Sequence, residues 1–469
     1  DWSYSMDVES QESRDRRKAT QSHGVKSEGG TGALAREERQ AFAAWEQKRT
    51  LTQHLMEKVC DRANLNQAYR RVRANHGAAG IDEMTVEELP KWIGKHKEEL
   101  IRSLLEGEYT PKPVRGVEIP KAGGGVRQLG IPTVVDRLVQ QAILQILEPI
   151  IDPTFSESSY GFRRGRSAHQ ALKKASEYVR EGNWVVVDLD LEKFFDRVNH
   201  DILMSRLARR IEDKRLLKTV RRFLEAGMMK QGVCVERHEG TPQGGPLSPL
   251  LANLLLDDLD RELEKRGHVF CRYADDCNVY VKSKAAGERV MNSIASFLEK
   301  KLKLRVNREK SAVAMPHERK FLGHRILRGG KIGIAPQSLE RAKDRIRMLT
   351  RRNRGRSLEV VVRQLNEFTT GWVTYYRYAA MRNHLLEMDN WVRRKLRCYR
   401  LKQRKRGSSI TDYLIRLGVP RERARTLGGS GKGWWRLSGC PAAHEAMTEE
   451  WFGQLGLVSL SQGWAALNA

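Results

Sequence analysis

The sequence has few cysteines, and none is arranged for metal binding or for obvious pairing. No CxxC pair and no Cys/His cluster with zinc-site spacing occurs among them. This scarcity argues against a disulfide-built secreted scaffold and against a structural zinc centre, and it predicts reduced, packed thiols, as in a cytosol. Two of the six flank an acidic turn and could face each other across a hairpin. The six are Cys60, Cys234, Cys271, Cys277, Cys398 and Cys440.

Long apolar runs are also missing. No stretch is long enough to span a bilayer, and no apolar segment with a small-residue cleavage site lies near the start. We therefore expect no membrane attachment and a cytoplasmic protein of a bacterium, associated with the nucleoid. The sequence begins with Asp1 rather than Met, so we expect the natural start to lie upstream.

Positive charge, in contrast, is abundant. Lys and Arg number 85 against 58 Asp and Glu, which gives a formal net charge of +27. Such a surplus favours a polyanionic partner, because each neutralised phosphate releases condensed counterions. An anionic membrane would require a lysine-rich amphipathic helix or a lipidation signal, and neither appears. The expected partner is nucleic acid.

Hydrophobic patterning predicts an α+β fold. Short apolar runs alternate with amphipathic helices between about 112 and 335 without a strict βαβ rhythm, and strand signals stop after about 336. Residues 114–131 predict two strands joined by a glycine hairpin, and 200–211 predict a helix capped by Asp201. The expected division is a disordered extension at 1–50, a catalytic unit at 51–335, basic helices at 336–406 and a short C-terminal region at 407–469.

Two acidic segments carry the chemistry. Tyr273-Ala274-Asp275-Asp276 lies in a strand–turn–strand pattern, and a turn is needed because adjacent strand side chains point to opposite faces. Alone, such a turn is more often simply solvated. However, the apolar strand at 184–190 ends in Asp190, and a buried carboxylate is costly unless it is paired or binds metal.

The first strand leaves a choice of ligand open. Asp188 and Asp190 share one face because the strand period is two, so periodicity alone selects neither. Three carboxylates from two strands suit two Mg²⁺ ions roughly 4 Å apart, with Mn²⁺ as a substitute. One ion would activate a 3′-hydroxyl, and the other would hold a triphosphate and its leaving group.

An ordered series of motifs resembles the reverse-transcriptase blocks of group II intron-encoded proteins, and its details are similar to the compact class C branch. The resemblance extends from about residue 52 to the end. It implies a right-hand polymerase with fingers, palm and a helical, basic thumb called domain X. The motifs are VEIPKAGGGVRQLGIP, SYGFRRGRSAHQAL, VVVDLDLEKFFDRVNHDIL, GTPQGGPLSPLLANLLL, RYADD, LRVNREKS and RKFLGH.

The resemblance assigns roles to single residues. In the family the metal-binding Asp lies five residues before an aromatic, which fits Asp190 and Phe195 and makes Asp188 structural. Phe195 would then exclude a ribose 2′-hydroxyl. The catalytic and metal-binding set is Asp190, Asp275 and Asp276. The nucleotide-binding set adds Lys121, Arg127, Gln243 and Lys310, with Arg115 near the template.

The basic helices predict a surface for nucleic acid. Their cations exceed what solvation needs, and structured RNA is read through phosphates and shape. They are Arg377, Arg393, Arg394, Lys395, Arg397, Arg400 and Lys402. The aromatic residues Trp372, Tyr375, Tyr376 and Trp391 have the spacing of a helix core. Lys432, Trp434, Trp435 and Arg436 would either stack on nucleic acid or dock the tail, and the sequence leaves both open.

The resemblance implies an RNA-directed DNA polymerase and intron maturase. Such a protein binds its group II intron RNA, assists splicing, and copies the intron inserted in target DNA with dNTPs during retrohoming. The alternatives are a domesticated relative in DNA repair or defence, which Ala274 disfavours, and an RNA-binding splicing factor without catalysis. No cysteine pair follows the thumb, so we expect no endonuclease and a primer from a nick or a nascent strand.

Overall fold

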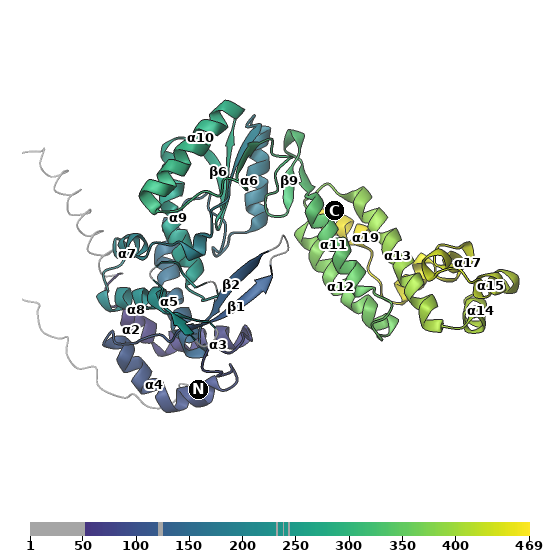
Figure 1. Ribbon diagram of the computed structural model, residues 1–469, viewed down its shortest axis with the longest axis horizontal. Coiled ribbons are helices and arrows are strands. Elements are labelled where there is room, and N and C mark those ends of the chain that lie inside the picture. Colours follow the sequence, from purple (N-terminus) through teal and green to yellow (C-terminus); the bar gives the residue numbers. More distant parts are fainter. Residues whose placement is uncertain (1–51, 121–124, 231–232, 238, 243) are drawn as a thin grey trace, which may run out of the picture.

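The computed structural model describes residues 52–120, 125–230, 233–237, 239–242 and 244–469. Two four-stranded sheets, a two-stranded sheet of β9 (His324–Ile326) and β10 (Ile332–Ile334), and their helices form one part of the molecule, and the helices after β10 extend away from it (Figure 1). The predicted α+β class and the end of strand structure near residue 335 are confirmed. The extension expected at 1–50 lies outside the described residues.

An antiparallel sheet of four strands contains the acidic motifs. Its strand order is β6-β7-β3-β8, so the central strands come from distant parts of the chain. Valine forms the middle of β3 because β-branched side chains favour strands, and Val185, Val186 and Val187 are all buried. The strands are β3 (Val185–Leu189), β6 (Val269–Tyr273), β7 (Asp276–Val281) and β8 (Ala312–Ala314).

Helices cover both faces of this sheet. Val187 and Val279 pack in one apolar cluster with α9 and α10, whereas Val186 and Tyr280 on the opposite face pack with α6. The sheet that carries the acidic motifs therefore lies between two layers of helices. The helices are α6 (Ala168–Arg180), α9 (Ser248–Lys265) and α10 (Lys284–Phe297), which continues into a π-helical turn (Leu298–Leu302). Further along the chain, a short turn (Arg328–Gly330) joins β9 (His324–Ile326) to β10.

A second sheet has the strand order β2-β1-β4-β5. The strands β1 (Val114–Pro120) and β2 (Val126–Ile131) pair antiparallel, as the sequence predicts. β1 also pairs in parallel with β4 (Met228–Lys230), which pairs with β5 (Val233–Val235). The glycine loop between β1 and β2 lies outside the described residues, apart from Gly125.

The helices after β10 form a separate apolar cluster. It extends from Ile334 to Leu460, so the segments expected at 336–406 and 407–469 share one core. Asp389 of α13 fastens α19 to it, because its carboxylate accepts hydrogen bonds from the backbone and hydroxyl groups at the start of α19. The helices are α11 (Pro336–Leu349), α12 (Leu358–Tyr375), α13 (Arg382–Arg404), α14 (Gly407–Arg416), α15 (Arg421–Gly428), α16 (Trp434–Leu437), α17 (Pro441–Ala446), α18 (Glu449–Gln454) and α19 (Leu460–Asn468).

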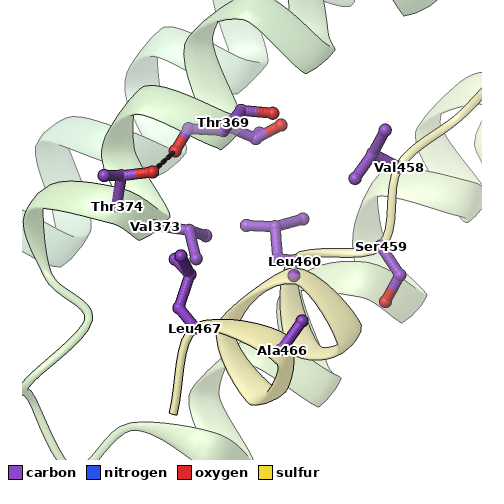
Figure 2. A pocket seen from close by; sticks show the side chains of 10 residues that line it. Thr369, Val373, Thr374, Val458, Ser459, Leu460, Ala466 and Leu467 are labelled. Atoms are coloured by element: carbon purple, nitrogen blue, oxygen red, sulfur yellow. Dashed lines mark hydrogen bonds between the residues drawn. The ribbon is translucent and has the colours of Figure 1, made fainter. Parts of the chain in front are cut away.

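A pocket of about 220 Å³ lies between α12 and α19. Figure 2 shows Val373, Leu460 and Leu467 around it, with the Thr374 hydroxyl donating to the carbonyl of Thr370 at 2.8 Å. Its lining is apolar apart from threonine and serine hydroxyls. Because no acidic or basic side chain lines it, this pocket does not qualify as a site for phosphoryl chemistry.

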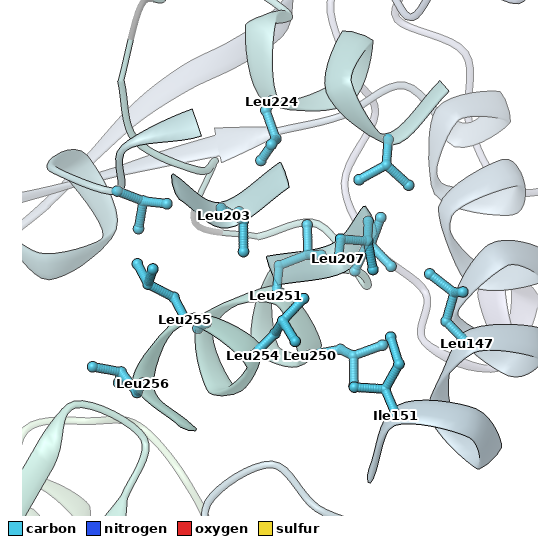
Figure 3. Packing of buried hydrophobic residues seen from close by; sticks show 14 of the residues in the cluster. Leu147, Ile151, Leu203, Leu207, Leu224, Leu250, Leu251, Leu254, Leu255 and Leu256 are labelled. Carbon is cyan, nitrogen blue, oxygen red and sulfur yellow. The ribbon is translucent and has the colours of Figure 1, made fainter. Parts of the chain in front are cut away.

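The largest core lies where α5, α7, α8 and α9 meet. Figure 3 shows leucines of α9 pointing toward Leu147 and Ile151 of α5 and toward Leu203 and Leu207 of α7. Burying each such side chain contributes about 1.5–3 kcal/mol. The helices not yet given are α2 (Leu55–Cys60), α3 (Arg62–Ala74), α4 (Leu89–Leu105), α5 (Val134–Ile151), α7 (His200–Ala208) and α8 (Lys214–Glu225), with short turns at Asp152–Thr154 and Phe194–Asp196.

The start of α7 corrects one prediction. The cap is Asn199, whose side chain accepts from the backbone N–H of Ile202 at 2.9 Å, and not Asp201. Asp201 lies in the first turn and forms an ion pair with Arg221. Asparagine and aspartate cap equally well, so composition alone does not distinguish two neighbouring candidates.

Aromatic residues join the thumb helices to the palm. The Tyr375 hydroxyl donates to the carbonyl of Leu322 at 2.9 Å, and the His169 ring contacts the carbonyl of Tyr375 at 2.7 Å. Tyr375 is 37% exposed, so the expectation that it belongs to the core is wrong, whereas Tyr376 is buried. His324 packs against both tyrosines, and burial lowers its pKa to about 4.

Candidate active site

The Tyr-Ala-Asp-Asp sequence forms a hairpin turn of two residues. Tyr273 ends β6 and pairs with Asp276, which begins β7, so Ala274 and Asp275 form the turn. Ala274 has a φ of 58°, in the left-handed region that costs a non-glycine residue about 1–2 kcal/mol. This turn interrupts the strand alternation that would otherwise aim Asp275 and Asp276 at opposite faces.

Asp190 lies beside this hairpin because β3 is the neighbour of β7. Their antiparallel register ends with the pair Leu189 and Cys277. The next residues along the two strands are Asp190 and Asp276, which therefore emerge at the same edge of the sheet. Sequence reasoning expected this meeting, and the strand pairing supplies it.

Asp276 shows how crowded with negative charge this edge is. Asp276 is exposed at the start of β7, but partial loss of solvent around its carboxyl group, together with the carboxylates of Asp275, Asp188 and Asp190, raises its pKa to about 6, while Lys320 opposes the rise. A carboxyl group surrounded by other acids gains from a bound cation, because the cation relieves their mutual repulsion.

The chemistry of these donors fits a hard divalent cation. All three predicted ligands are carboxylates, and hard oxygen donors suit Mg²⁺ or Mn²⁺ better than zinc. Within the residues that the structure describes, no three or more His, Cys, Asp or Glu side chains are already grouped to hold an ion. The fit therefore rests on the donor type and on the charge crowding at Asp276.

Asp188 has a partner of its own. Its carboxylate accepts from Nε of Arg319 at 2.8 Å, and Nη2 of the same guanidinium lies 2.7 Å from the same carboxylate oxygen in an ion pair. Burial raises the pKa of Asp188, and Arg319 opposes that rise. The same guanidinium donates to the carbonyl of Lys310. Asp188 thus belongs to a salt bridge that also holds the loop carrying Lys310.

Backbone hydrogen bonds tie this loop to Asp190. The Asp190 N–H donates to the Ser311 hydroxyl at 2.9 Å, and the Asn307 N–H donates to the Asp190 carbonyl at 2.8 Å. The loop therefore begins and ends against Asp190, the residue that follows β3. This arrangement places Lys310 at the site although it lies far from Asp190 in the sequence.

These parts enclose a cavity of about 680 Å³. Four predicted site residues line it together, namely Asp190, Asp275, Phe195 and Lys310. Phe195 is half-buried and packs edge-on against the buried Phe194, with ring centroids 5.1 Å apart. An open, mainly polar cavity bordered by carboxylates, basic side chains and aromatic rings has the features needed to hold a nucleoside triphosphate.

Other predicted nucleotide contacts are less defined. Lys121 and Gln243 lie outside the described residues, and of Arg127 only the backbone is described, in β2 opposite Ile119. Arg115 is half-buried in β1 and is not among the residues that line the cavity. Sequence reasoning also missed lining residues whose only signal is proximity to a motif, namely Gln128, Glu192, Lys193, Asp196, Asn307, Arg308 and Glu309.

A buried arginine, Arg272, connects the acidic turn to α9 through hydrogen bonds and an ion pair. Arg272 has no exposed surface and pairs with Asp260 of α9, with Nη2 and Oδ2 2.6 Å apart. Its Nη1 donates to the carbonyl of Ala274 at 2.9 Å and to the side chain of Asn253 at 2.8 Å. Its Nη2 also donates to the Ser159 hydroxyl. This network links α9 to the turn, and sequence reasoning did not identify it.

A glycine allows the turn to sit close to the segment before α6. A Cβ atom on Gly161 would lie 2.2 Å from the backbone nitrogen of Ala274 and 2.8 Å from the carbonyl carbon of Tyr273. The Asn253 side chain donates to the Gly161 carbonyl at 2.8 Å, which fixes this approach. The turn is therefore packed on one side by backbone rather than by a side chain.

Comparison with known proteins identifies the family. The model of "Reverse transcriptase (RNA-dependent DNA polymerase)" matches residues 119–326, and that of "Group II intron, maturase-specific domain" matches residues 339–414. Protein YkfC of Escherichia coli (strain K12) is 34% identical, and the match covers 59% of this chain and 83% of YkfC. The chain belongs to the group II intron-encoded reverse transcriptase and maturase family.

Two further likenesses are more limited. The group II intron-encoded protein LtrA of Lactococcus lactis subsp. cremoris is 38% identical, over 41% of this chain and 32% of LtrA. The chain thus matches about a third of that relative's length. A chain of the solved "Partial Cas6-RT-Cas1--Cas2 complex" is 27% identical over 53% of this chain and 43% of that chain, with a TM-score of 0.36.

Membership of the family has two direct consequences. The enzymatic activity of the reverse transcriptase domain is RNA-directed DNA polymerisation, and that domain depends on divalent metal ions. The maturase-specific domain implies binding to intron RNA. Among the described helices, none has the length and apolar composition needed to cross a bilayer.

The thumb cations do not form one uniform surface. Arg397 departs from expectation, because it is buried, its Nε donates to the carbonyl of Met447 at 3.0 Å, and burial lowers its pKa to about 10. Arg393 pairs with Glu449 at 2.9 Å. Arg400 donates to the Tyr413 hydroxyl. The predicted cations that retain exposed or half-exposed side chains include Arg377, Arg394, Lys395, Lys402, Lys432 and Arg436.

Proposed function

We propose that this family member polymerises deoxynucleotides on an RNA template at the cavity between the acidic edge of β3–β7 and the start of β2. The observation that supports it most is that Asp190, Phe195, Asp275 and Lys310 line one cavity although they come from three separate segments. A protein kept only for splicing has no need to bring these groups together.

The proposed ligands for two Mg²⁺ ions, or Mn²⁺ in their place, are Asp190, Asp275 and Asp276. When bound, such ions lower the pKa of the primer 3′-hydroxyl and neutralise charge on the triphosphate. The protein's own groups position the reactants. Lys310 would bind the triphosphate through its ammonium group, and the tethered loop from Asn307 to Ser311 would keep that lysine beside Asp190.

Primer extension tests the catalytic proposal. The full chain with a DNA primer annealed to RNA, dNTPs and Mg²⁺ should extend the primer. Asp275→Asn should reduce extension by at least about 1,000-fold, because electrostatic stabilisation of the transition state usually contributes most to catalysis at such sites. Asp201→Asn is the matched control, since its carboxylate is 80% exposed on α7. Normal extension by Asp275→Asn would refute the proposed role of this turn.

Selection of the sugar gives a second prediction. Phe195 is proposed to pack beneath the incoming sugar and to exclude a 2′-hydroxyl. Phe195→Ala should raise the relative kcat/KM for ribonucleotides by about 10–100-fold while dNTP incorporation falls much less, because the variant removes a clash rather than a catalytic group. Single-nucleotide incorporation with dNTP and NTP pairs measures this ratio. An unchanged ratio would assign Phe195 to packing alone.

For biological context, we propose that the chain binds its own group II intron RNA, assists splicing and copies the intron after insertion into target DNA. Support comes from the maturase-specific domain and from relatives whose names place them in introns. Sequencing the RNA that co-purifies with the protein should return one enriched structured intron. Recovery of only bulk cellular RNA would favour the domesticated alternative. If the Asp275→Asn variant still promotes splicing of the intron, the maturase function does not require the polymerase active site.

A further inference from the structure

A second cavity, lined by aromatic and basic side chains, lies in the thumb, remote from the acidic edge. It has a volume of about 290 Å³ and is formed by α11, α13, α16 and the segment after α11. Its lining combines two indoles with three cations and contains no acidic side chain. The lining residues are Arg347, Thr350, Arg352, Trp391, Lys395, Cys398 and Trp435.

The cations of this cavity are arranged around the indole rings. The Lys395 ammonium lies 5.0 Å from the Trp391 ring centroid and 5.7 Å from that of Trp435. The Arg347 guanidinium lies 5.6 Å from the Trp391 centroid. These distances are typical of cation–π contacts, which hold cationic heads over rings without neutralising their charge.

Positive charge in the cavity is only partly compensated. Arg347 has two carboxylate partners on its own helix, Asp344 at 2.6 Å and Glu340 at 3.8 Å. Arg352, in the part of the chain that the structure describes, has the thiol of Cys398 as its hydrogen-bond partner at 3.6 Å. Burial lowers the pKa of Lys395, and the repulsion of Arg347 and Arg352 lowers it further. An anion entering here would relieve that repulsion.

Trp435 is held in place although much of its ring is open. The Trp435 side chain is 41% exposed, and the Arg394 guanidinium lies 4.2 Å from its ring centroid. Its carbonyl accepts from Nη2 of Arg394 at 3.2 Å and from the Ser438 hydroxyl at 2.8 Å. A fixed but exposed indole beside cations whose charge is only partly compensated resembles a stacking platform more than a core residue.

We propose that this cavity binds one unpaired nucleotide of RNA, with its base stacked on Trp435 and its phosphate held by Lys395 and Arg352. The inference rests on the proposed binding of intron RNA and names a point of contact for it. The volume is near the lower end of the roughly 300–1,000 Å³ of small-ligand pockets and suits a single ring system. All the lining residues except Trp435 lie within the span matched by the maturase-specific domain.

The test measures binding of the full chain to a short, unstructured, end-labelled RNA over a series of salt concentrations. Trp435→Ala should weaken binding by about 5–100-fold, since stacking of one base on an aromatic ring contributes an affinity of that size. Lys395→Gln should lower the slope of log affinity against log salt by about 0.7, the value for one phosphate of a single strand. Trp435→Phe, which keeps an aromatic face, should retain most of the affinity.

Controls make each outcome decisive. Trp184→Ala removes a tryptophan that is 53% exposed and distant in sequence from the cavity, and it should bind as the unchanged protein does. Equal binding by all variants would overturn the proposal. An equal loss of affinity for a fully paired RNA hairpin would also overturn it, because that result would indicate recognition of charge alone. Stronger, equally sensitive binding to single-stranded DNA would overturn the assignment to RNA.

Failure of the broader function is distinguishable from failure of the pocket. Unchanged protein that neither extends a primer nor binds intron RNA would refute the proposed function. If the unchanged protein extends a primer and binds intron RNA, and Trp435→Ala binds unpaired RNA with the same affinity as the unchanged protein, only the proposed pocket is refuted. Thermal unfolding of each variant identifies any loss of RNA affinity that comes from misfolding. If Trp435→Ala does not fold, Trp435→Phe can still be compared with the unchanged protein.

Discussion

Gly161→Ala is expected to reduce primer extension by about 100-fold while the protein remains folded. The new Cβ would lie 2.2 Å from the backbone nitrogen of Ala274, and neither partner is a flexible side chain that could move aside. The turn bearing Asp275 would therefore shift by roughly 1 Å, and a displacement of that size costs about 10² in rate.

The measurement is single-turnover extension on an RNA template, with circular dichroism to verify the fold. Gly94→Ala is the matched control, because a Cβ there meets nothing within 4 Å and the residue lies inside α4. That control should keep full activity and gain about 0.5–1 kcal/mol of stability. If Gly161→Ala extended primers at the normal rate, close backbone packing would not be what positions the turn.

Arg272→Met is expected to lower the free energy of unfolding by about 3–5 kcal/mol. Removing one partner of a fully buried ion pair leaves the other charge without compensation, and Asp260 has no exposed surface. The loss also removes the donor to the carbonyl of Ala274, so the catalytic turn loses its support from α9. Primer extension should therefore fall even at temperatures where the variant is still folded.

Urea denaturation measures the stability change. The matched control is Arg221→Met, because its ion pairs with Asp201 and Glu225 lie on the surface and should contribute less than about 1 kcal/mol. Arg272→Met/Asp260→Leu should recover part of the loss, since it removes both charges together. A loss below about 1 kcal/mol for Arg272→Met would show that the buried pair is dispensable.

The carboxylates and their strands could be predicted because their signals are local. A run of valines ending in acid and a strand–turn–strand with two adjacent aspartates depend only on period and turn chemistry, and the structure brings Asp190 and Asp275 to one cavity. Choosing Asp190 over Asp188 needed the family resemblance. In the structure Arg319 pairs with Asp188, and the choice of Asp190 as the metal ligand stays a prediction.

The remaining parts depend on contacts between distant segments, which no local pattern encodes. Arg272 looks like one more cation in a basic chain, and only the packing of α9 under β6 brings Asp260 to it. Arg397 appears in the same basic run as its neighbours, yet its position on α13 turns it inward to Met447. Charge counts predict a basic thumb, but they do not tell which cations face solvent.

The sheet order has a consequence for how the enzyme is made. Asp190 receives its support from Ser311, which is 121 residues later in the chain, and β3 lies between β7 and β8, both of which are synthesised after it. At about 5–20 residues per second, a ribosome needs about 6–24 s to cover that distance. For most of this interval the valine strand has neither neighbour, because β7 is also synthesised late in it, so a nascent chain carries an exposed, aggregation-prone segment without the acidic turn. We expect its yield in cells to depend on chaperones that shield β3 until β8 has emerged.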